Sequence, residues 1–266
     1  MTAFIDLDGA AAVVTGAGSG IGRACAVSFA RRGAGVVVSD VDPMRAEAVA
    51  AEIVDGGGRA VGLRCDVADQ TDLERLRDTG LERFGHVDLV MNNVGVIAMG
   101  PPETLPLSEW QRVIDINVLG MVRSNLVFLP LLIAQGSGHV VNTASMSGLL
   151  PHGYDRLPYV ASKHAVVGMS ESMALYLRPR GVGVTCLCPS GVNTNIREQI
   201  TFTGPASTPR SPDYPIVDAH VVGELVADAV TAGQFFVLTA PGVQDELEER
   251  VRDLDAYVAR LSTQQL

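Results

Sequence analysis

The sequence predicts an α/β protein with one doubly wound, mostly parallel sheet of seven strands and helices on both faces. Short apolar runs alternate with longer helical patterns along the whole chain. The runs are apolar throughout and do not alternate with polar residues, as expected for strands that helices cover on both sides. No linker or shift in composition interrupts the series, so we expect residues 1–266 to form a single domain.

The expected elements follow one another closely. Apolar, β-branched runs predict the strands, at residues 10–15, 35–39, 59–65, 87–91, 139–142, 182–188 and 234–239. Helical periodicity between them predicts helices at residues 21–32, 43–55, 69–84, 106–115, 118–135, 159–178 and 218–231. Glycines end several of these helices, among them Gly33 and Gly136.

Two segments near the C-terminus stand outside this alternation. Residues 195–216 are rich in proline and lack periodicity, which predicts a substrate lid, because long irregular stretches in compact domains often cover binding sites. Residues 243–262 are expected to form a C-terminal helix. A narrow apolar stripe with spacings of four and three residues marks one side of that helix, at Leu247, Val251, Leu254, Val258 and Leu261.

Charge and composition exclude several classes of partner. The formal net charge is -10 and the pI about 4.9, without a basic run, which argues against nucleic acid and anionic membranes. Asp6 and Asp8 stand where a signal peptide would be apolar. The longest apolar run, residues 126–134, is too short for a membrane span and contains Pro130. We therefore expect a soluble, cytoplasmic protein.

The four cysteines predict no metal site. Cys186 and Cys188 could suggest a metal-binding pair, but they lie in the apolar run 182–188, and no second Cys/His pair has ligand spacing. Buried thiols in a strand are the better interpretation of this pair.

A glycine-rich loop joins the first strand to the first helix, in the sequence Thr15-Gly-Ala-Gly-Ser-Gly-Ile-Gly22. Glycines let the backbone turn sharply and approach a pyrophosphate, and the helix N-terminus supplies free N–H groups. A second strand and an acid, Asp40, follow, as a dinucleotide site requires. The expected phosphate contacts are Gly16, Ser19, Gly20, Ile21 and Gly22.

Asp40 indicates which dinucleotide is bound. A carboxylate at the end of the second strand can accept hydrogen bonds from the ribose hydroxyls of NAD and would repel the 2′-phosphate of NADP. No arginine stands at position 19 or 41 to offset this charge. We expect NAD as the cofactor. The alternative is that Asp40 only caps the turn at residues 42–43.

Tyr159 and Lys163 lie four residues apart at the start of an expected helix, which places both side chains on one face. Lys163 is the only lysine in the chain, and every other cationic side chain is arginine. A pair on the surface of an ordinary helix is the competing interpretation of this short motif.

Together these features resemble the short-chain dehydrogenase/reductase family over nearly the whole chain. The markers occur in the family's order, namely the glycine loop, Asp66, Asn92-Asn93-x-Gly95, Asn117, Ser145, Tyr159-x-x-x-Lys163 and the Pro189–Thr194 turn. The resemblance implies a Rossmann-like sheet and a nicotinamide cofactor. Valine at position 94 and serine at position 190 depart from the alanine and glycine that are usual in the family, which puts only fine geometry in doubt.

The resemblance also implies the roles of individual residues. The catalytic group would be Asn117, Ser145, Tyr159 and Lys163, with Asn117 holding a water behind Lys163. Asp66 would contact the adenine, and Asn92 would steady the sheet near the cofactor. Val192 and Thr194 would hold the nicotinamide amide. The remaining cofactor contacts implied by the matching motifs are Val67, Asn93, Gly95 and Pro189, together with Tyr159 and with Lys163 at the ribose.

The chemistry of hydride transfer explains why these residue types are needed. Oxidation of an alcohol requires a base at its hydroxyl, and a free tyrosine with a pKa near ~10 is a poor base at neutral pH. We expect Lys163 and the oxidised nicotinamide to lower the pKa of Tyr159, because neighbouring cations favour the phenolate. Ser145 can donate to the substrate oxygen. Ser147 is the rival for this role, and Asn117 could instead bond locally within its helix.

We therefore expect an NAD-dependent oxidoreductase that acts on a secondary alcohol or its ketone. Apolar residues near the expected pocket favour a hydrophobic or alicyclic substrate, namely Val94, Val96, Met146, Leu149 and Leu150. His152 lies in the substrate-side loop and could touch a ligand or be an exposed loop residue. The alternatives are an epimerase or dehydratase of the same fold, and a non-catalytic NAD-binding regulator. Helices 118–135 and 159–178 pair between subunits in the family, which implies a homodimer or homotetramer.

Overall fold

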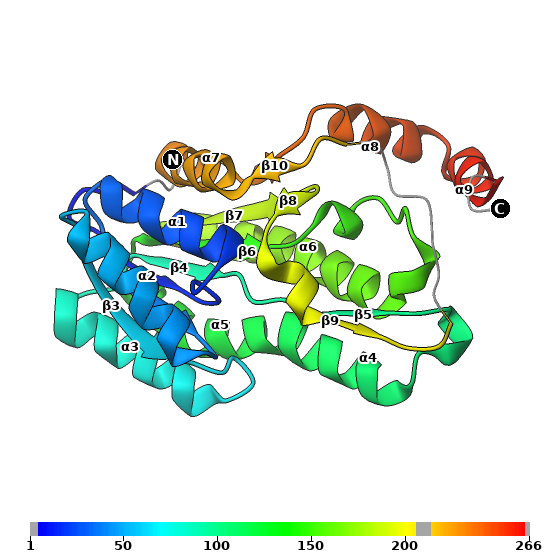
Figure 1. The fold of residues 1–266 in the computed structure, drawn as a ribbon. Helices are drawn as coiled ribbons and strands as arrows, with labels where there is room; N and C mark the ends of the chain where they lie inside the picture. The colour runs from blue at the N-terminus through cyan, green and yellow to red at the C-terminus, as the bar shows by residue number, and fades with distance from the viewer. Residues whose placement is uncertain (1–4, 206–213, 264–266) are drawn as a thin grey trace.

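The computed structural model describes residues 5–205 and 214–263 and contains the predicted seven-stranded sheet (Figure 1). The strand order is β11-β7-β6-β4-β1-β2-β3, and every neighbouring pair is parallel. The strands are β1 (Ala11–Val14), β2 (Gly35–Asp40), β3 (Arg59–Arg64), β4 (Leu89–Asn92), β6 (Gly138–Thr143), β7 (Val182–Cys188) and β11 (Phe236–Leu238). The strand order reverses between β1 and β4, which opens a crevice at their carboxyl ends.

Helices cover both faces of the sheet and enclose two hydrophobic cores (Figure 1). One core lies under α1 (Gly20–Arg31), α2 (Pro43–Asp55) and α7 (Ala219–Ala232), with Phe29 fully buried at its centre. The other lies under α3 (Gln70–Phe84), α5 (Gly120–Gln135) and α6 (Leu157–Leu177). The apolar strands contribute side chains to both cores, which confirms the doubly wound fold predicted from their composition.

Capping residues explain where several helices begin. The side chains of Asp42, Asp69 and Asp218 each accept a hydrogen bond from the backbone N–H two residues later, at the starts of α2, α3 and α7. Helix α6 begins at Leu157, two residues earlier than predicted, with Pro158 in its first turn. Tyr159 therefore lies within the first turn and does not open the helix.

The two helices predicted at residues 106–115 and 118–135 form one continuous helical stretch. A π turn, Asp115–Leu119, joins α4 (Leu107–Ile114) to α5. By length and composition alone, the stretch Leu107–Gln135 could cross a membrane, and 39% of its most apolar window is buried inside the molecule. It packs against α3 and α6, as a core helix does.

The chain after β7 is more regular than predicted. β8 (Val192–Asn193) pairs in parallel with β10 (Val217–Asp218). The 3-10 helix η6 (Asn195–Gln199) leads into β9 (Ile200–Phe202), which pairs in parallel with β5 (Ile97–Met99). Thus the first part of the expected lid, residues 195–216, is ordered by pairing with the distant segment β5. Residues 206–213 of that lid lie outside the described residues.

The single C-terminal helix expected over residues 243–262 is wrong. Two helices are present, α8 (Val243–Arg252) and α9 (Leu254–Thr263), because Asp253 between them has extended backbone angles. The predicted apolar stripe does not form one buried face either, since Val251, Leu254 and Val258 are exposed. Instead Tyr257 is the fully buried side chain of α9. Both helices follow β11 in the chain and lie at the end of the molecule marked C (Figure 1).

Short 3-10 turns complete the connections between these elements. They are η1 (Pro102–Thr104), η3 (Met146–Gly148), η4 (Tyr154–Arg156) and η5 (Arg178–Arg180). Of these, η3 directly follows Ser145, and η4 directly precedes α6, so two of them shape the loop between Ser145 and Tyr159.

Candidate active site

The glycine loop leaves the first N–H groups of α1 available. Gly16 and Gly20 have φ angles of 61° and 54°, a conformation that favours glycine. Ser19 is the N-cap of α1, yet its side chain makes no capping hydrogen bond. The N-terminal N–H groups of a helix need partners and carry a partial positive charge. This cradle therefore fits a phosphate-bearing cofactor, as the sequence predicts for Gly16, Ser19, Gly20, Ile21 and Gly22.

Close packing at Gly22 fixes the shape of that loop. A Cβ atom on Gly22 would lie 2.3 Å from the carbonyl oxygen of Gly16 and 2.6 Å from Nδ2 of Asn93. Asn93 donates from Nδ2 to that carbonyl over 3.1 Å and accepts from Thr143 at Oδ1 over 3.2 Å. Asn93 thus links the glycine loop to the ends of β4 and β6. The neighbouring Asn92 donates to Asn142, between β4 and β6, so its role lies within the sheet.

Asp40 lies at the end of β2 beside the glycine loop. Its Oδ2 accepts a hydrogen bond from the N–H of Gly18 over 3.1 Å, and its Oδ1 accepts one from the N–H of Asp42 over 3.1 Å. Asp40 therefore caps the following turn, as the alternative interpretation expects, and also lies beside the glycine loop, where its contact with a ribose stays a prediction. Its carboxylate is half-buried and retains lone pairs for ribose hydroxyls.

Arg45 is a cation beside this site that the sequence pattern did not reveal. The Arg45 Cβ would be 2.6 Å from a Cβ on Gly18. Its guanidinium pairs with Asp42 over 3.5 Å and with Glu198 of η6 over 2.9 Å. The turn between β2 and α2 brings Arg45 close to the glycine loop. An arginine that could offset the Asp40 charge was expected only at positions 19 and 41, so position 45 gave no signal in the sequence.

Asp66 and Val67 follow β3 at the same edge of the sheet. Asp66 is half-buried, and its Oδ1 accepts from the N–H of Ala68 over 2.9 Å. Val67 is buried against Gly120, where a Cβ would lie 2.9 Å from Cγ2 of Val67. Gly120 therefore lets the start of α5 approach this strand end closely.

Ser145 and Tyr159 come together from β6 and α6. The Ser145 hydroxyl lies near enough to the Tyr159 phenol to act against the rise in its pKa that burial causes. Ser145 Oγ also accepts from the N–H of Ser147 over 3.1 Å, which fixes its position and leaves its hydroxyl proton free to donate. Ser147 meets Ser145 through this backbone group, so the geometry favours Ser145 over its rival.

Lys163 lies beside Tyr159, as the helical spacing predicts. Its Nζ is 5.7 Å from the centre of the Tyr159 ring and donates to the carbonyl oxygen of Thr143 over 2.8 Å. A Cβ on Gly95 would lie 3.3 Å from the same Nζ. The lysine side chain is 3% exposed, and burial lowers its pKa to about 8.

The expected lowering of the pKa of Tyr159 is not found in the protein alone. Burial raises the pKa of the phenol, and the Ser145 hydroxyl and the charge of Arg156 oppose this effect only in part. Removal of the phenol from water, which the motif alone does not reveal, raises the pKa of Tyr159 more than the neighbouring groups lower it. Arg156, at the N-terminus of α6, is a second cation near Tyr159 that no sequence spacing predicted, because its nearness depends on the η4 turn.

Asn117 lies in the π turn and is 3% exposed. Its Oδ1 accepts from the N–H of Val96 over 2.8 Å, and its Nδ2 donates to the carbonyl oxygen of Val96 and to Ser162 Oγ, each over 3.0 Å. Asn117 therefore fixes the segment after β4 to α6, one residue before Lys163. π turns of this kind occur frequently at functional sites.

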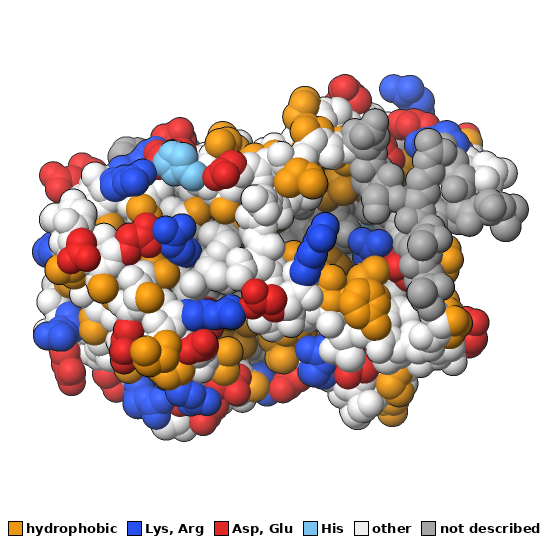
Figure 2. Space-filling view, viewed as in Figure 1, with side chains coloured by type: hydrophobic (Ala, Val, Ile, Leu, Met, Phe, Trp, Pro, Cys, Tyr) orange, Lys and Arg blue, Asp and Glu red, His pale blue; other side chains and the backbone are white. Residues whose placement is uncertain are grey.

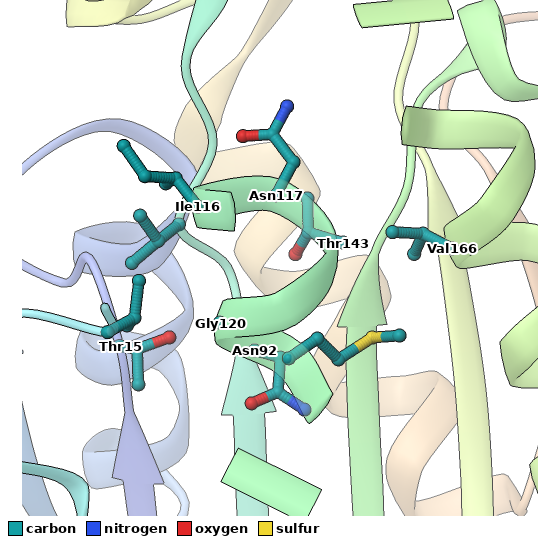
Figure 3. A pocket seen from close by; sticks show the side chains of 10 residues that line it. Thr15, Asn92, Ile116, Asn117, Gly120, Thr143 and Val166 are labelled. Carbon is teal, nitrogen blue, oxygen red and sulfur yellow. The ribbon is translucent and has the colours of Figure 1, made fainter. Parts of the chain in front are cut away.

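A pocket lies at the carboxyl ends of β1, β4 and β6, where the strand order reverses (Figure 3). Thr15, Asn92 and Thr143 reach it from the three strands, while Ile116 and Asn117 come from the π turn. The remaining lining residues are Val67, Val94, Gly120, Met121 and Val166. The Asn117 side chain extends away from Thr15 and Asn92 (Figure 3).

The Pro189–Thr194 turn lies across the glycine loop. The carbonyl oxygen of Pro189 accepts from the N–H of Met146 over 2.9 Å, which joins this turn to the residue after Ser145. Val192 lies in β8, and a Cβ on Gly20 would be 3.0 Å from Cβ of Thr194. Thr194 also caps η6 through Ile196 N over 3.3 Å. Thr194, one of the two residues predicted to hold the nicotinamide amide, is thus close to the glycine loop.

The two departures from the family pattern have structural partners. Val94 lines the pocket, and its Cγ2 would be 3.1 Å from a Cβ on Gly16. The N–H of Ser190 donates to Oγ1 of Thr239 over 2.9 Å, which ties the turn after β7 to the end of β11.

His152 bonds to Glu246 of α8 over 2.8 Å and is half-buried, so it is not an exposed loop residue.

The four cysteines are buried thiols, as predicted. Cys186 and Cys188 place their sulfur atoms 3.8 Å apart on β7. Within residues 5–205 and 214–263, no group of three His, Cys, Asp or Glu side chains could hold a metal ion. On the face drawn in Figure 2, acidic and basic side chains are interspersed and form no continuous basic patch.

Comparison with known proteins links this geometry to a family. Residues 10–203 match the family described as short chain dehydrogenase. A 1-deoxy-11-beta-hydroxypentalenate dehydrogenase of Streptomyces exfoliatus is 35% identical over 252 residues, covering 94% of this chain and 90% of the relative. A cyclohexanol dehydrogenase of Acinetobacter sp. (strain SE19) is 36% identical over 185 residues, covering 69% of this chain and 73% of the relative.

A solved structure agrees with both the sequence match and the fold. The short chain dehydrogenase/reductase from Burkholderia phymatum in complex with NAD has a TM-score of 0.86 and 32% sequence identity, covering 95% of this chain and 96% of that one. The central parallel sheet with its surrounding helices is therefore Rossmann-like. With the matching family model, the related sequences and this shared fold, the chain belongs to the short chain dehydrogenase family.

Proposed function

We propose that this protein is an NAD-dependent oxidoreductase that transfers a hydride between nicotinamide and a secondary alcohol or its ketone. The observation that carries the proposal is the convergence of Ser145, Tyr159 and Lys163 at the sheet edge that also bears the glycine loop. A nucleotide-binding protein without catalysis has no need of this group. The two dehydrogenases among its relatives support the same reaction class.

The chain's own residues supply the proton transfer. Tyr159 takes the hydroxyl proton when it is ionised, and the Ser145 hydroxyl donates to the substrate oxygen and stabilises its developing charge. Lys163, fixed by Thr143, presents a compact ammonium near the phenol and the expected ribose position. When bound, oxidised nicotinamide supplies the hydride acceptor and a further positive charge. That charge would oppose the rise in the pKa of Tyr159 that burial causes.

Asp40 supports NAD as the preferred cofactor. Its carboxylate faces the cradle, and the nearby cation, Arg45, already pairs with Asp42 and Glu198. The 2′-phosphate of NADP would meet the Asp40 charge. We expect Asp40→Ala to raise the Kd of NAD and lower that of NADP, changing their ratio by about tenfold or more. Fluorescence titration of both cofactors measures it, and an unchanged ratio would remove the argument for NAD.

The substrate is proposed to be hydrophobic or alicyclic. Met146, Leu149 and Leu150 follow Ser145 and are buried in one apolar cluster, while Val96 is buried in another and bonds to Asn117 through its backbone. The names of the relatives that act on a pentalenate and on cyclohexanol support a ring-bearing alcohol. Residues 195–216 are proposed to cover this substrate as a lid, anchored by β9 at their start.

One assay separates this function from its alternatives. Purified protein is mixed with NAD and a panel of secondary alcohols that includes cyclohexanol, and reduced nicotinamide is followed by absorbance. We expect reduction with at least one cyclic alcohol, and reversal with the ketone and NADH. Tight NAD binding without reduction by any member would favour a regulator. Substrate conversion without net reduction, followed by chromatography, would favour an epimerase or dehydratase.

Exposed apolar side chains support assembly into a homodimer or homotetramer. The exposed fractions lie between 43% and 82% for Leu119 at the end of the π turn, Leu126 on α5, and Leu175 and Tyr176 on α6. Single exposed apolar residues are ordinary, but these lie on two long apolar helices that the family uses between subunits. A cytoplasmic location is proposed with this assignment.

A further inference from the structure

A partly buried carboxylate on α8 joins three separate segments of the chain. Glu246 accepts hydrogen bonds at Oε1 from His152 Nε2 over 2.8 Å and from the Tyr257 hydroxyl over 2.9 Å. Its Oε2 accepts from the Tyr214 hydroxyl. The side chain of Glu246 is 16% exposed. The chemistry at Ser145 and Tyr159 uses none of these four residues directly.

The three donors come from the parts of the chain that border the substrate side. His152 lies in the loop between Ser145 and Tyr159. Tyr214 belongs to the proposed lid and is the first described residue after position 205. Tyr257 is the buried side chain of α9. Glu246 therefore links the loop after Ser145, the far end of the lid and the last helix through one carboxylate.

Apolar contacts join the same segments as these hydrogen bonds. Val243 and Tyr257 are buried in the same cluster as Met146, Leu149 and Leu150, the residues that follow Ser145. Leu247 and Leu261 pack against this cluster from the same two helices. The C-terminal helices thus support the outer side of the apolar wall proposed for the substrate.

The electrostatics favour a charged carboxylate at this place. Burial alone would raise the pKa of Glu246, but hydrogen bonds from Tyr214 and His152 more than offset it, so its pKa is lowered. Burial and the Glu246 carboxylate raise the pKa values of Tyr214 and Tyr257, which keeps both hydroxyls protonated as donors. Hydrogen bonds to a charged acceptor are stronger than neutral ones.

We propose that Glu246 is a positioning residue for the substrate site, holding the loop after Ser145 and the end of the lid against α8 and α9. The proposal rests on the alcohol dehydrogenase function above. Because bulky substrates need the complete apolar wall, Glu246 should set affinity for ring-bearing alcohols while leaving the cofactor site and the proton transfer at Tyr159 unchanged.

The test compares Glu246→Ala with Glu249→Ala, since both glutamates lie on α8. Glu249 pairs with Arg260 over 3.1 Å and is half exposed, so this control carries the same substitution on the same helix. For Glu246→Ala we expect the KM for cyclohexanol to rise about tenfold or more, as for loss of charged hydrogen bonds. The NAD Kd and kcat should stay within about twofold, and the KM for 2-propanol should change much less.

Two further variants keep the test decisive if Glu246→Ala does not fold. Tyr214→Phe and Tyr257→Phe each remove one hydroxyl and retain the ring, so each should raise the cyclohexanol KM by a smaller factor. His152→Ala should also raise the cyclohexanol KM, because it removes one of the three donors to Glu246. Equal KM in the wild type and Glu246→Ala, or an equal rise with Glu249→Ala, would overturn the proposal.

A readout without turnover separates this proposal from the proposed function. Amide hydrogen exchange of residues 146–153 should become faster in Glu246→Ala and remain unchanged in Glu249→Ala. This result would stand even if no alcohol were oxidised, in which case only the assigned reaction would fail. Unchanged exchange in both variants would show that Glu246 does not hold the loop.

Discussion

At the scale of single residues, Lys163 is the most constrained side chain in the site. It is the only lysine of the chain, and it is almost fully buried beside Tyr159. Burial disfavours its charged form, and its hydrogen bond to the Thr143 carbonyl fixes the ammonium in place. Burying this compact charge therefore comes at a cost to stability.

That cost predicts the behaviour of Lys163→Met. The pKa of Lys163 is lowered from 10.5 to about 8, which corresponds to roughly 3 kcal/mol. Below pH 8 the folded protein bears this cost. As pH rises from 8 to 10.5 the cost disappears, because only the unfolded chain still binds the proton. The methionine variant should be inactive yet more stable at pH 7, by up to about 3 kcal/mol less the lost hydrogen bond.

Urea denaturation of both proteins at pH 7 and pH 10 measures this effect. The difference between variant and wild type isolates position 163, because other titrating groups are common to both. The variant's gain in free energy of unfolding should shrink at the higher pH. A difference that is the same at both pH values would contradict a buried, charged lysine.

The sequence predicted which side chains meet at the candidate site but not their electrostatics. Tyr159, Lys163 and Ser145 were recognisable because helical spacing and strand ends determine which side chains can meet. The raised pKa of Tyr159 was not predictable, since desolvation depends on the packing of many residues distant in sequence. For the same reason the approach of Arg156 and the hydrogen bonds at Glu246 had no signal in the sequence pattern.

At the scale of elements, the glycine loop and the start of α1 form one rigid unit. Gly22 has a negative φ, so its need for glycine comes from space and not from backbone angles. Any Cβ there would meet the Gly16 carbonyl at 2.3 Å and Nδ2 of Asn93 at 2.6 Å. Backbone atoms of the loop itself must then move.

We expect Gly22→Ala to weaken NAD binding by tenfold or more, because the displaced loop no longer presents its N–H groups to the phosphates. Gly56→Ala at the end of α2 is a suitable control, since its Cβ would meet carbonyl oxygens at 3.4 Å, an ordinary contact. Calorimetric titration with NAD distinguishes the two. Wild-type affinity in Gly22→Ala would show that the loop can adjust without cost.

Element boundaries were predictable where local chemistry sets them. Aspartate caps and apolar runs placed most of the strands and helices within two residues, and α2 and β7 at their observed bounds. The π turn at residues 115–119 and the pairing of β9 with β5 were missed, because each depends on contacts between distant segments. The break between α8 and α9 was missed because the apolar residues keep a regular spacing of four and three residues across Asp253, whose extended backbone ends α8.

At the scale of the whole molecule, the topology follows from one rule applied repeatedly. Parallel strands joined by helical crossovers place helices on both faces and all strand carboxyl ends at one edge. This rule was sufficient to predict the sheet and the edge where the site lies. The proposed assembly and the proposed lid depend on contacts with other molecules, which the apolar periodicity of this chain does not specify.

The proposed assembly predicts the effect of a charge on α6. Leu175 is 82% exposed, and Leu175→Glu should shift the protein from an oligomer toward monomers, because an unpaired carboxylate would be buried at the interface. Met44→Glu is the control, as Met44 is 70% exposed on α2, outside the two long helices. Light scattering coupled to size-exclusion chromatography gives the mass of each. A wild type that elutes as a monomer would contradict the assembly.

The central claim, that Tyr159 is the base of a nicotinamide-dependent alcohol oxidation, is tested most directly by Tyr159→Phe. The variant keeps the ring beside Lys163 and removes only the hydroxyl that accepts the proton. With NAD and an alcohol that the wild type oxidises, we predict a fall in kcat of about 10²–10⁴-fold, with the Kd of NAD within about twofold of wild type. A variant that retains a substantial part of the wild-type kcat would contradict the account.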